Sequence, residues 1–159
     1  MGDSCQHHHH DGPPLAADVA RAVAAAGERV TAEGERMTAA RTRVLELLMT
    51  SGEPVKAYDL IARFGEDGQP AKPPTVYRAL EFLERKGLAH RIASISAYVA
   101  CASGDEEHTA AFLICDCCGA TEEVSAPVAE GLDRAARTAG YVIERTTVEA
   151  HGRCPACAA

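Results

Sequence analysis

Hydrophobic positions recur at helical spacing over most of the first hundred residues. An alanine-rich stretch over residues 15–33 keeps its charged side chains apart from its apolar ones, which predicts an amphipathic helix. A second helix is expected to begin at Thr38, a favourable N-cap, and to end at Gly52 and Pro54. A short third helix is expected over residues 57–64.

The fourth helix carries the clearest pattern. Pro73 and Pro74 are typical of a first helical turn, and Gly87 is expected to end the helix. Its predicted core face comprises Val76, Ala79, Leu80 and Leu83, and its predicted outer face comprises Thr75, Tyr77, Arg78, Glu81 and Arg85. Two short β-prone segments, 88–92 and 97–101, then predict a hairpin. Helices followed by a two-stranded hairpin are typical of a winged helix-turn-helix, whose reading helix would be the fourth.

The remaining pattern alternates strand, strand, helix and strand, over residues 109–115, 122–125, 128–139 and 141–148. The overall prediction is an α+β chain with four parts: a His-containing tail (1–14), a winged-helix DNA-binding domain (15–101), a hinge (102–108) and a small α/β domain (109–159). The last part has 51 residues, too few for a comfortable core. A metal and a partner subunit are therefore both expected to stabilise it.

Composition and charge narrow the class of protein. The apolar fraction is 47%, and no run is long enough to cross a bilayer or to form a signal-peptide core, which predicts a cytoplasmic protein. The net charge is -7, but residues 36–93 carry ten Lys and Arg against seven acids between two acidic flanks. This asymmetry indicates a local anion-binding face on the predicted winged helix.

Seven cysteines in a cytoplasmic chain favour metal binding over disulfides. Cys115 and Cys118 form one C-x-x-C pair, and Cys154 and Cys157 form another. Together they supply the four thiolates of a closed, structural zinc site. Cys118 is preferred over Cys117 because Gly119 follows it, where a zinc-binding turn needs a permissive residue. The alternatives are a redox C-x-x-C or unrelated buried cysteines.

Four further residues could bind a second metal: His90, Cys101, His108 and Glu123. An antiparallel hairpin can bring its two ends together, so His90 and Cys101 can converge although eleven positions apart. The thiolate would favour zinc over iron or manganese. Spacing alone leaves open that each residue is an ordinary packed or surface residue. His151 beside the second C-x-x-C is a further possible ligand, although a surface role or support of the ligands is the preferred interpretation.

Four further segments accompany the two C-x-x-C pairs: Thr38–Leu48, Ala57–Ile61, Lys72–Leu83 and Glu149–Cys154. Together with those pairs they resemble the ferric uptake regulator superfamily, and within it the zinc uptake regulator branch. The resemblance extends from about Met37 to Cys157. It implies a homodimer that binds palindromic operator DNA and represses zinc-acquisition genes when zinc is plentiful.

The resemblance also implies roles for individual residues. The regulatory zinc would be held by His90, Cys101, His108 and Glu123, tying the wing to the small domain, so that each chain binds two zinc ions. DNA contacts would fall on Tyr58, Tyr77 and Arg78, with half-buried packing as the alternative for Tyr58. The iron-sensing branch usually has several histidines before the first C-x-x-C, whereas here residues 105–108 retain one. This favours zinc, with an iron- or peroxide-responsive regulator as the alternative and a third, oxygen-rich site left open.

Two other classes of protein remain at this stage. A thiol redox sensor or oxidoreductase would use Cys115, Cys117 and Cys118 as reactive thiolates. A constitutive DNA-binding module would contain structural zinc alone. The chain has no phosphate-binding loop, no H-E-x-x-H and no Ser/His/Asp order, so we expect a protein that is not an enzyme.

Overall fold

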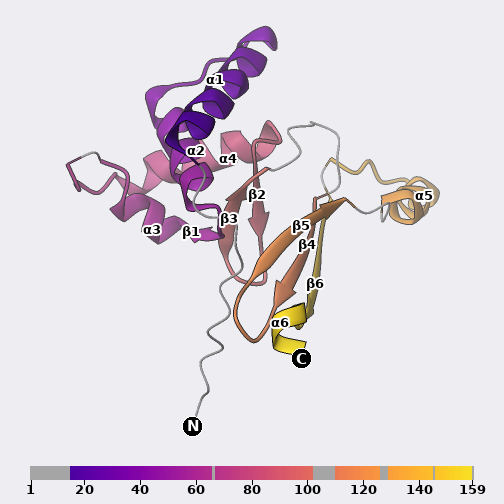
Figure 1. Ribbon diagram of the computed structural model, residues 1–159. Helices are drawn as coiled ribbons and strands as arrows, with labels where there is room; N and C mark the ends of the chain where they lie inside the picture. Colours follow the sequence, from indigo (N-terminus) through magenta and orange to yellow (C-terminus); the bar gives the residue numbers. More distant parts are fainter. Residues whose placement is uncertain (1–14, 66, 102–109, 126–128, 145, 159) are drawn as a thin grey trace. The chain divides into compact units, whose positions relative to one another are not determined.

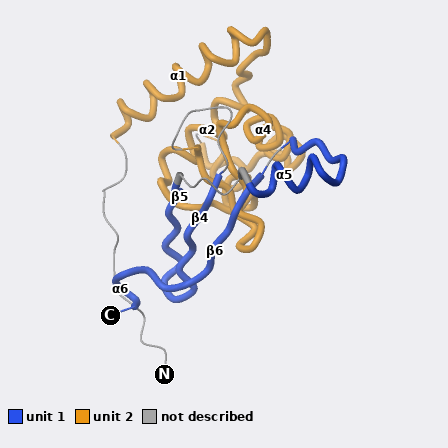
Figure 2. The backbone as a smooth tube through the Cα atoms, turned by 90° about the vertical axis from the view of Figure 1, so that its right-hand side faces the viewer, with its two compact units in different colours: residues 1–10, 107–159 blue, residues 11–106 orange. Residues whose placement is uncertain are grey.

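The computed structural model describes residues 15–65, 67–101, 110–125, 129–144 and 146–158. The predicted His-containing tail and hinge lie outside these residues. The chain divides into two compact units, shown in different colours in Figure 2. Unit 2 comprises residues 11–106, and unit 1 comprises residues 107–159 together with residues 1–10. In the described residues no helix is both long enough and apolar enough to span a membrane.

Unit 2 is a helical bundle with a small antiparallel sheet (Figure 1). Its elements are α1 (Ala16–Ala32), α2 (Ala39–Ser51), β1 (Val55–Lys56), α3 (Ala57–Ala62), α4 (Pro73–Arg85), β2 (Ala89–Ile92) and β3 (Ala97–Ala100). The strand order is β1-β3-β2, so the predicted hairpin is present as β2 and β3. Strand β1 was not predicted, because two residues are too short to show an alternating pattern.

The helix ends lie where the local chemistry places them. The Thr38 hydroxyl accepts a hydrogen bond from the backbone N–H of Arg41 at 3.4 Å, which caps α2. Gly52 ends the same helix in a left-handed conformation with φ 63°. Pro73 and Pro74 occupy the first turn of α4, where their missing N–H groups leave no hydrogen bond unmade. These ends of α2 and α4 agree with the sequence prediction.

The core of unit 2 is formed by aliphatic side chains of all four helices and of the sheet. Phe82 belongs to this core at 2% exposure, although the predicted core face of α4 omitted it. The Arg41 guanidinium lies over the Phe82 ring, 3.4 Å from its centroid. A buried aromatic ring beside a cation gains from apolar burial and from attraction to its π face. The core face of α4 is therefore wider than the sequence predicted.

Unit 1 is built on a second three-stranded sheet. Its elements are β4 (Ala110–Cys115), β5 (Thr121–Ser125), α5 (Ala129–Ala139), β6 (Thr147–Gly152) and α6 (Pro155–Ala158). The central strand β4 pairs antiparallel with β5 and parallel with β6. The β4–β6 register sets Ala110 opposite Thr147 and Cys115 opposite Gly152.

The last predicted strand was wrong in its position. The sequence predicted a strand over residues 141–148, whereas β6 covers Thr147–Gly152 and residues 141–143 are not in a strand. Tyr141 and Val142 have strong β propensity, but both are largely exposed. Pairing with β4 determines which residues form the last strand. The residues that pair are Thr147–Gly152, which lead directly to the second C-x-x-C.

Candidate metal centre and nucleic-acid interface

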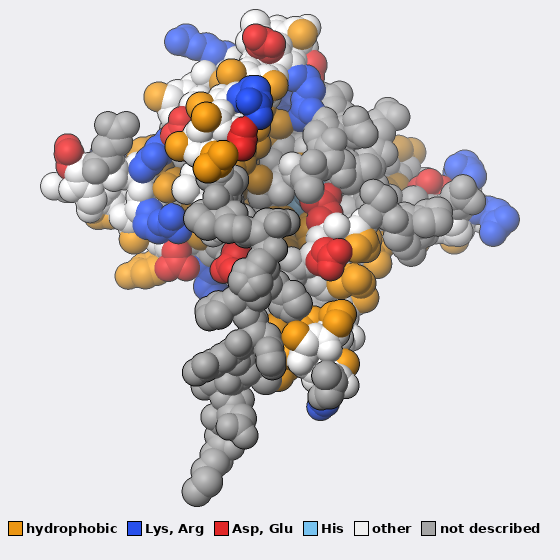
Figure 3. Space-filling view, viewed as in Figure 1, with side chains coloured by type: hydrophobic (Ala, Val, Ile, Leu, Met, Phe, Trp, Pro, Cys, Tyr) orange, Lys and Arg blue, Asp and Glu red, His pale blue; other side chains and the backbone are white. Residues whose placement is uncertain are grey.

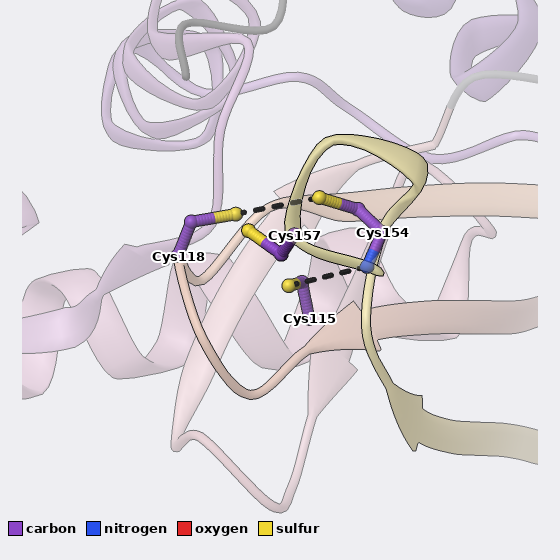
Figure 4. Close-up of side chains that lie close together, drawn as sticks. All are labelled: Cys115, Cys118, Cys154 and Cys157. Carbon is purple, nitrogen blue, oxygen red and sulfur yellow. Dashed lines mark hydrogen bonds between the residues drawn. The ribbon is translucent and has the colours of Figure 1, made fainter. Parts of the chain in front are cut away.

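Two tight turns of unit 1 bring four thiols together. Cys115 is the last residue of β4, and Cys118 lies in the turn before β5. Cys154 follows β6, and Cys157 lies in the single turn of α6. The parallel pairing of β4 with β6 holds these two turns side by side, with the Asp116 N–H donating to the Gly152 carbonyl at 2.9 Å. Figure 4 shows the four side chains directed toward one another.

The spacing of the sulfur atoms suits one tetrahedral zinc ion. The four Sγ atoms all lie within 4.8 Å of one another, and those of Cys118 and Cys154 are 3.7 Å apart. Zn–S bonds of about 2.3 Å in a tetrahedron require sulfur atoms roughly 3.8 Å apart. Cys117 is exposed and is not part of this group. The residues present therefore fit a zinc ion bound by four thiolates.

Backbone hydrogen bonds prepare one of the four thiols for metal binding. The backbone N–H groups of Cys118 and Cys154 donate to Cys115 Sγ, the latter at 3.3 Å. These hydrogen bonds lower the pKa of Cys115 to about 6, against the opposing effect of burial. Burial raises the pKa of the Cys157 thiol, so a bound cation would favour loss of its proton. Cys115 is therefore the thiol whose ionised form the backbone stabilises.

The turn after β4 needs its glycine. Gly119 has φ +77°, a conformation that side chains with a Cβ disfavour, and its N–H donates to the Cys115 carbonyl at 2.9 Å. The chain reverses there so that Cys118 faces Cys115. This is the glycine whose position after Cys118 favoured Cys118 over Cys117 as a ligand.

A polar contact also joins the two turns. His151 Nδ1 lies 2.8 Å from Asp116 Oδ1. His151 was predicted from the sequence as a residue beside the site, whereas Asp116 was not predicted. The two residues come together because β4 and β6 pair in parallel, with His151 opposite Ile114. Composition and spacing do not reveal this register. His151 does not belong to the four-thiol group, in keeping with its preferred interpretation as a residue beside the site.

A second set of potential ligands lies on the wing of unit 2. His90 on β2 is opposite Val99 on β3, and Cys101 directly follows β3. The hairpin brings a ring nitrogen of His90 and the Sγ of Cys101 within 4.8 Å of each other. Glu123 lies on β5 of unit 1, and His108 lies outside the described residues. The structure thus brings together the two members of the predicted set that share a hairpin.

The predicted DNA contacts lie on the surface of unit 2. Tyr58 on α3 is 78% exposed and Tyr77 on α4 is 51% exposed, which excludes the half-buried packing considered for Tyr58. Arg78 is also exposed. Exposed cations lie on or beside the same two helices: Lys56, Arg63 and Lys72. Figure 3 shows Lys and Arg side chains on the side of the view where α3 lies. This surface can therefore attract phosphate groups.

The chain combines a helix-turn-helix, whose last helix is exposed, with a four-thiol centre. A family model described as the ferric uptake regulator family matches residues 32–151. The chain belongs to this family. The zinc uptake regulation protein of Escherichia coli (strain K12) is 41% identical over 119 residues, which are 74% of this chain and 70% of that protein.

Solved structures of the family show the same fold. A zinc uptake regulator complexed with zinc and DNA is 37% identical, with a TM-score of 0.78 over 88% of this chain and 95% of that one. The crystal structure of holo XcZur is 38% identical, with a TM-score of 0.76 over 91% and 99% of the two chains. These relatives are transcriptional regulators, and this family member is likewise a regulator and not an enzyme.

Proposed function

We propose that the protein is a zinc-responsive transcriptional repressor. It binds palindromic operator DNA as a dimer when its regulatory zinc site is filled, and it represses genes for zinc uptake. The proposal rests above all on one observation: the His90–Cys101 pair lies on the hairpin that directly follows the reading helix. The Cys101 N–H donates to the Leu88 carbonyl at 3.0 Å, and the Leu88 N–H donates to the Leu83 carbonyl of α4 at 2.8 Å. Two backbone hydrogen bonds therefore connect a metal ligand to the helix that reads DNA.

Each chain is proposed to bind two zinc ions with separate roles. Cys115, Cys118, Cys154 and Cys157 form the structural site, since four thiolates leave no open coordination position. His90, Cys101, His108 and Glu123 form the regulatory site, and their single thiolate favours zinc over iron or manganese. The relatives whose names or structures refer to zinc support this choice of metal.

Three residues are proposed to contact operator DNA. Arg78 has the length and the donors to reach a guanine edge, and Tyr77 and Tyr58 can contact thymine methyl groups or phosphates. Their exposure on α3 and α4 supports this role. The solved relative that is complexed with zinc and DNA supports the DNA partner.

Apolar surface on unit 1 supports the proposed homodimer. Large hydrophobic side chains exposed on this unit are Leu113, Leu132, Tyr141 and Val142. Several exposed apolar residues on so small a unit are typical of a surface that another protein covers. We propose that unit 1 is the dimerisation domain and that unit 2 is the DNA-binding domain.

Zinc and DNA binding are proposed to be coupled. If zinc selects the conformation that fits the operator, DNA must tighten zinc binding by the factor by which zinc tightens DNA binding. The test is operator affinity across buffered free zinc, with iron and manganese as controls, on an operator selected from random duplex DNA. We expect affinity to rise with zinc alone. An equal response to iron would favour the iron-sensing alternative, and no response to any metal would favour constitutive binding.

A further inference from the structure

A compact ion cluster joins the end of the reading helix to the segment that follows α1. Lys86 is the C-cap residue of α4, and its Nζ lies 2.6 Å from Glu33 Oε2 and 2.7 Å from Glu35 Oε1. Arg85, the last residue of α4, also contacts Glu35, with NH2 3.2 Å from Oε2. The Lys86 side chain is only 15% exposed. One largely buried ammonium therefore binds two carboxylates from the chain between α1 and α2.

A backbone contact reinforces the same connection. The Arg29 guanidinium, in the last turn of α1, donates to the Lys86 carbonyl at 3.5 Å. The carbonyls at the end of a helix have no partner within the helix, and a cation beside them also favours the helix dipole. Side chains from α1 and its following loop thus bind both the side chain and the carbonyl of one residue at the end of α4.

The protonation behaviour of the cluster agrees with strong pairing. Hydrogen bonds to Glu33 and then Glu35 raise the pKa of Lys86, although burial opposes this effect. The hydrogen bond from Lys86 lowers the pKa of Glu35. Lys86 and Glu35 therefore both stay charged around neutral pH.

Stability is a weak explanation for this arrangement. Ion pairs near a protein surface contribute little to stability, and partial burial adds a desolvation cost that the pairing must offset. Their geometry, by contrast, is specific, because Lys86 must meet two carboxylates at once. Lys86 also lies immediately before Gly87, whose φ is 61°, at the junction between α4 and the wing.

We propose that Lys86, held by Glu33 and Glu35, is a positioning residue that sets the orientation of the reading helix α4 and thereby the affinity for operator DNA. The inference rests on the proposed function and extends it, because it assigns a role in DNA recognition to α1 and its following loop. None of the three residues contacts DNA in this scheme. Their effect reaches DNA through the position of Tyr77 and Arg78 on α4.

The test compares Lys86→Met with Lys86→Arg in the full-length, zinc-loaded protein. Lys86→Met keeps most of the length of the side chain but removes the ammonium group that binds the two carboxylates. We expect it to weaken operator binding roughly 2- to 30-fold, the range typical of residues that act on a site without touching the ligand. Lys86→Arg restores a cation and should recover most of the affinity. The double variant Glu33→Gln, Glu35→Gln should resemble Lys86→Met.

Two controls separate positioning from general stability. Arg21→Met removes a cation of α1 whose carboxylate partner, Asp18, is on the same helix, so operator affinity should not change. Val30→Ala thins the packing of α1, where Val30 is fully buried, without changing any charge. If Val30→Ala weakens operator binding as much as Lys86→Met at a similar loss in Tm, the positioning role is wrong.

Salt dependence separates positioning from direct phosphate contact. Losing a phosphate contact reduces the slope of log affinity against log salt by about 1, whereas a positioning residue leaves the slope unchanged. A flatter slope for Lys86→Met, or unchanged affinity, would overturn the inference.

A second measurement does not depend on DNA. Hydrogen exchange of the backbone amides over residues 83–88 should accelerate in Lys86→Met more than in Val30→Ala. Unchanged exchange there would also overturn the inference. If the parent binds operator without any response to zinc, the proposed function fails, while the ratio of variant to parent affinity still tests the role of Lys86.

Discussion

Cys101 and Cys118 are both half-buried cysteines, but their surroundings differ. Cys118 is one of four thiols brought together by two turns of unit 1. Cys101 lies beside His90 at the end of the wing hairpin. One residue type therefore serves two proposed sites, and matched substitutions can separate metal sensing from folding.

Replacing each cysteine by serine should give opposite results. Serine preserves the shape but is a poor zinc ligand because its hydroxyl does not ionise near neutral pH. Cys101→Ser should retain one tightly bound zinc per chain and a near-normal Tm, yet lose zinc-dependent operator binding. Cys118→Ser should lose the structural ion, which releases about 10–16 kcal/mol on binding in zinc-finger peptides, and so unfold unit 1. Metal analysis of both variants and the parent measures the zinc content per chain. Zinc titrations of operator affinity on the same three proteins measure the regulatory response. A full zinc response in Cys101→Ser would move the regulatory site elsewhere.

Arg78 tests the proposed reading helix. If its guanidinium binds a guanine, Arg78→Ala should cost about 1–3 kcal/mol of operator affinity and relax the base preference at one position per half-site. Affinities for the selected operator and for single-base variants measure both effects. A uniform loss across sequences with a flatter salt dependence would make Arg78 a phosphate contact, and no loss would remove this face of α4 from the groove.

At the scale of elements, caps and hairpins were the most predictable features. Thr38 and Gly52 mark the ends of α2 by chemistry that acts within a few residues, so sequence alone could place them. The same holds for the approach of His90 to Cys101, which follows from hairpin pairing. Residues 141–143 were predicted less well. Their β propensity predicted a strand, but the strand that pairs with β4 begins only at Thr147. The pairing of Asp116 with His151 depends on the same long-range register and was invisible for the same reason.

The turn that carries Cys118 offers a test at this scale. Gly119→Ala meets no atom within 4 Å of the added Cβ, so its cost arises from the left-handed backbone alone. We expect a loss of about 1–2 kcal/mol in the stability of the zinc-bound unit. Gly152→Ala is the matched control, since that glycine also has open space but no positive φ, and it should be close to neutral. Chelator competition and thermal unfolding measure both variants. Equal effects at the two positions would contradict the conformational explanation.

At the scale of the whole molecule, the exposed apolar residues of unit 1 should control assembly. Val142 is 90% exposed, so Val142→Asp should leave the fold of the single chain intact. If this residue lies in the dimer interface, burying a carboxylate there should shift the zinc-loaded protein toward monomers and weaken operator binding. Analytical ultracentrifugation at micromolar concentration measures the shift. Leu15→Asp changes an exposed leucine of unit 2 and should leave the dimer unchanged. A stable dimer of Val142→Asp would place the interface on other residues.

The parallel pairing of β4 with β6 also has a kinetic consequence. These strands are distant in sequence, so the chain must close a long loop before their hydrogen bonds can form, and such topologies fold slowly. The four thiols lie at the ends of the same two strands, and zinc captured by the unfolded chain would close that loop first. The refolding rate of unit 1 should therefore rise with the free zinc concentration. It should reach a plateau once every unfolded chain binds zinc before it folds. Stopped-flow refolding across buffered zinc should show this rise and plateau in the parent. In Cys118→Ser, whose unit 1 is expected to stay unfolded, no refolding phase of that unit should appear at any zinc concentration.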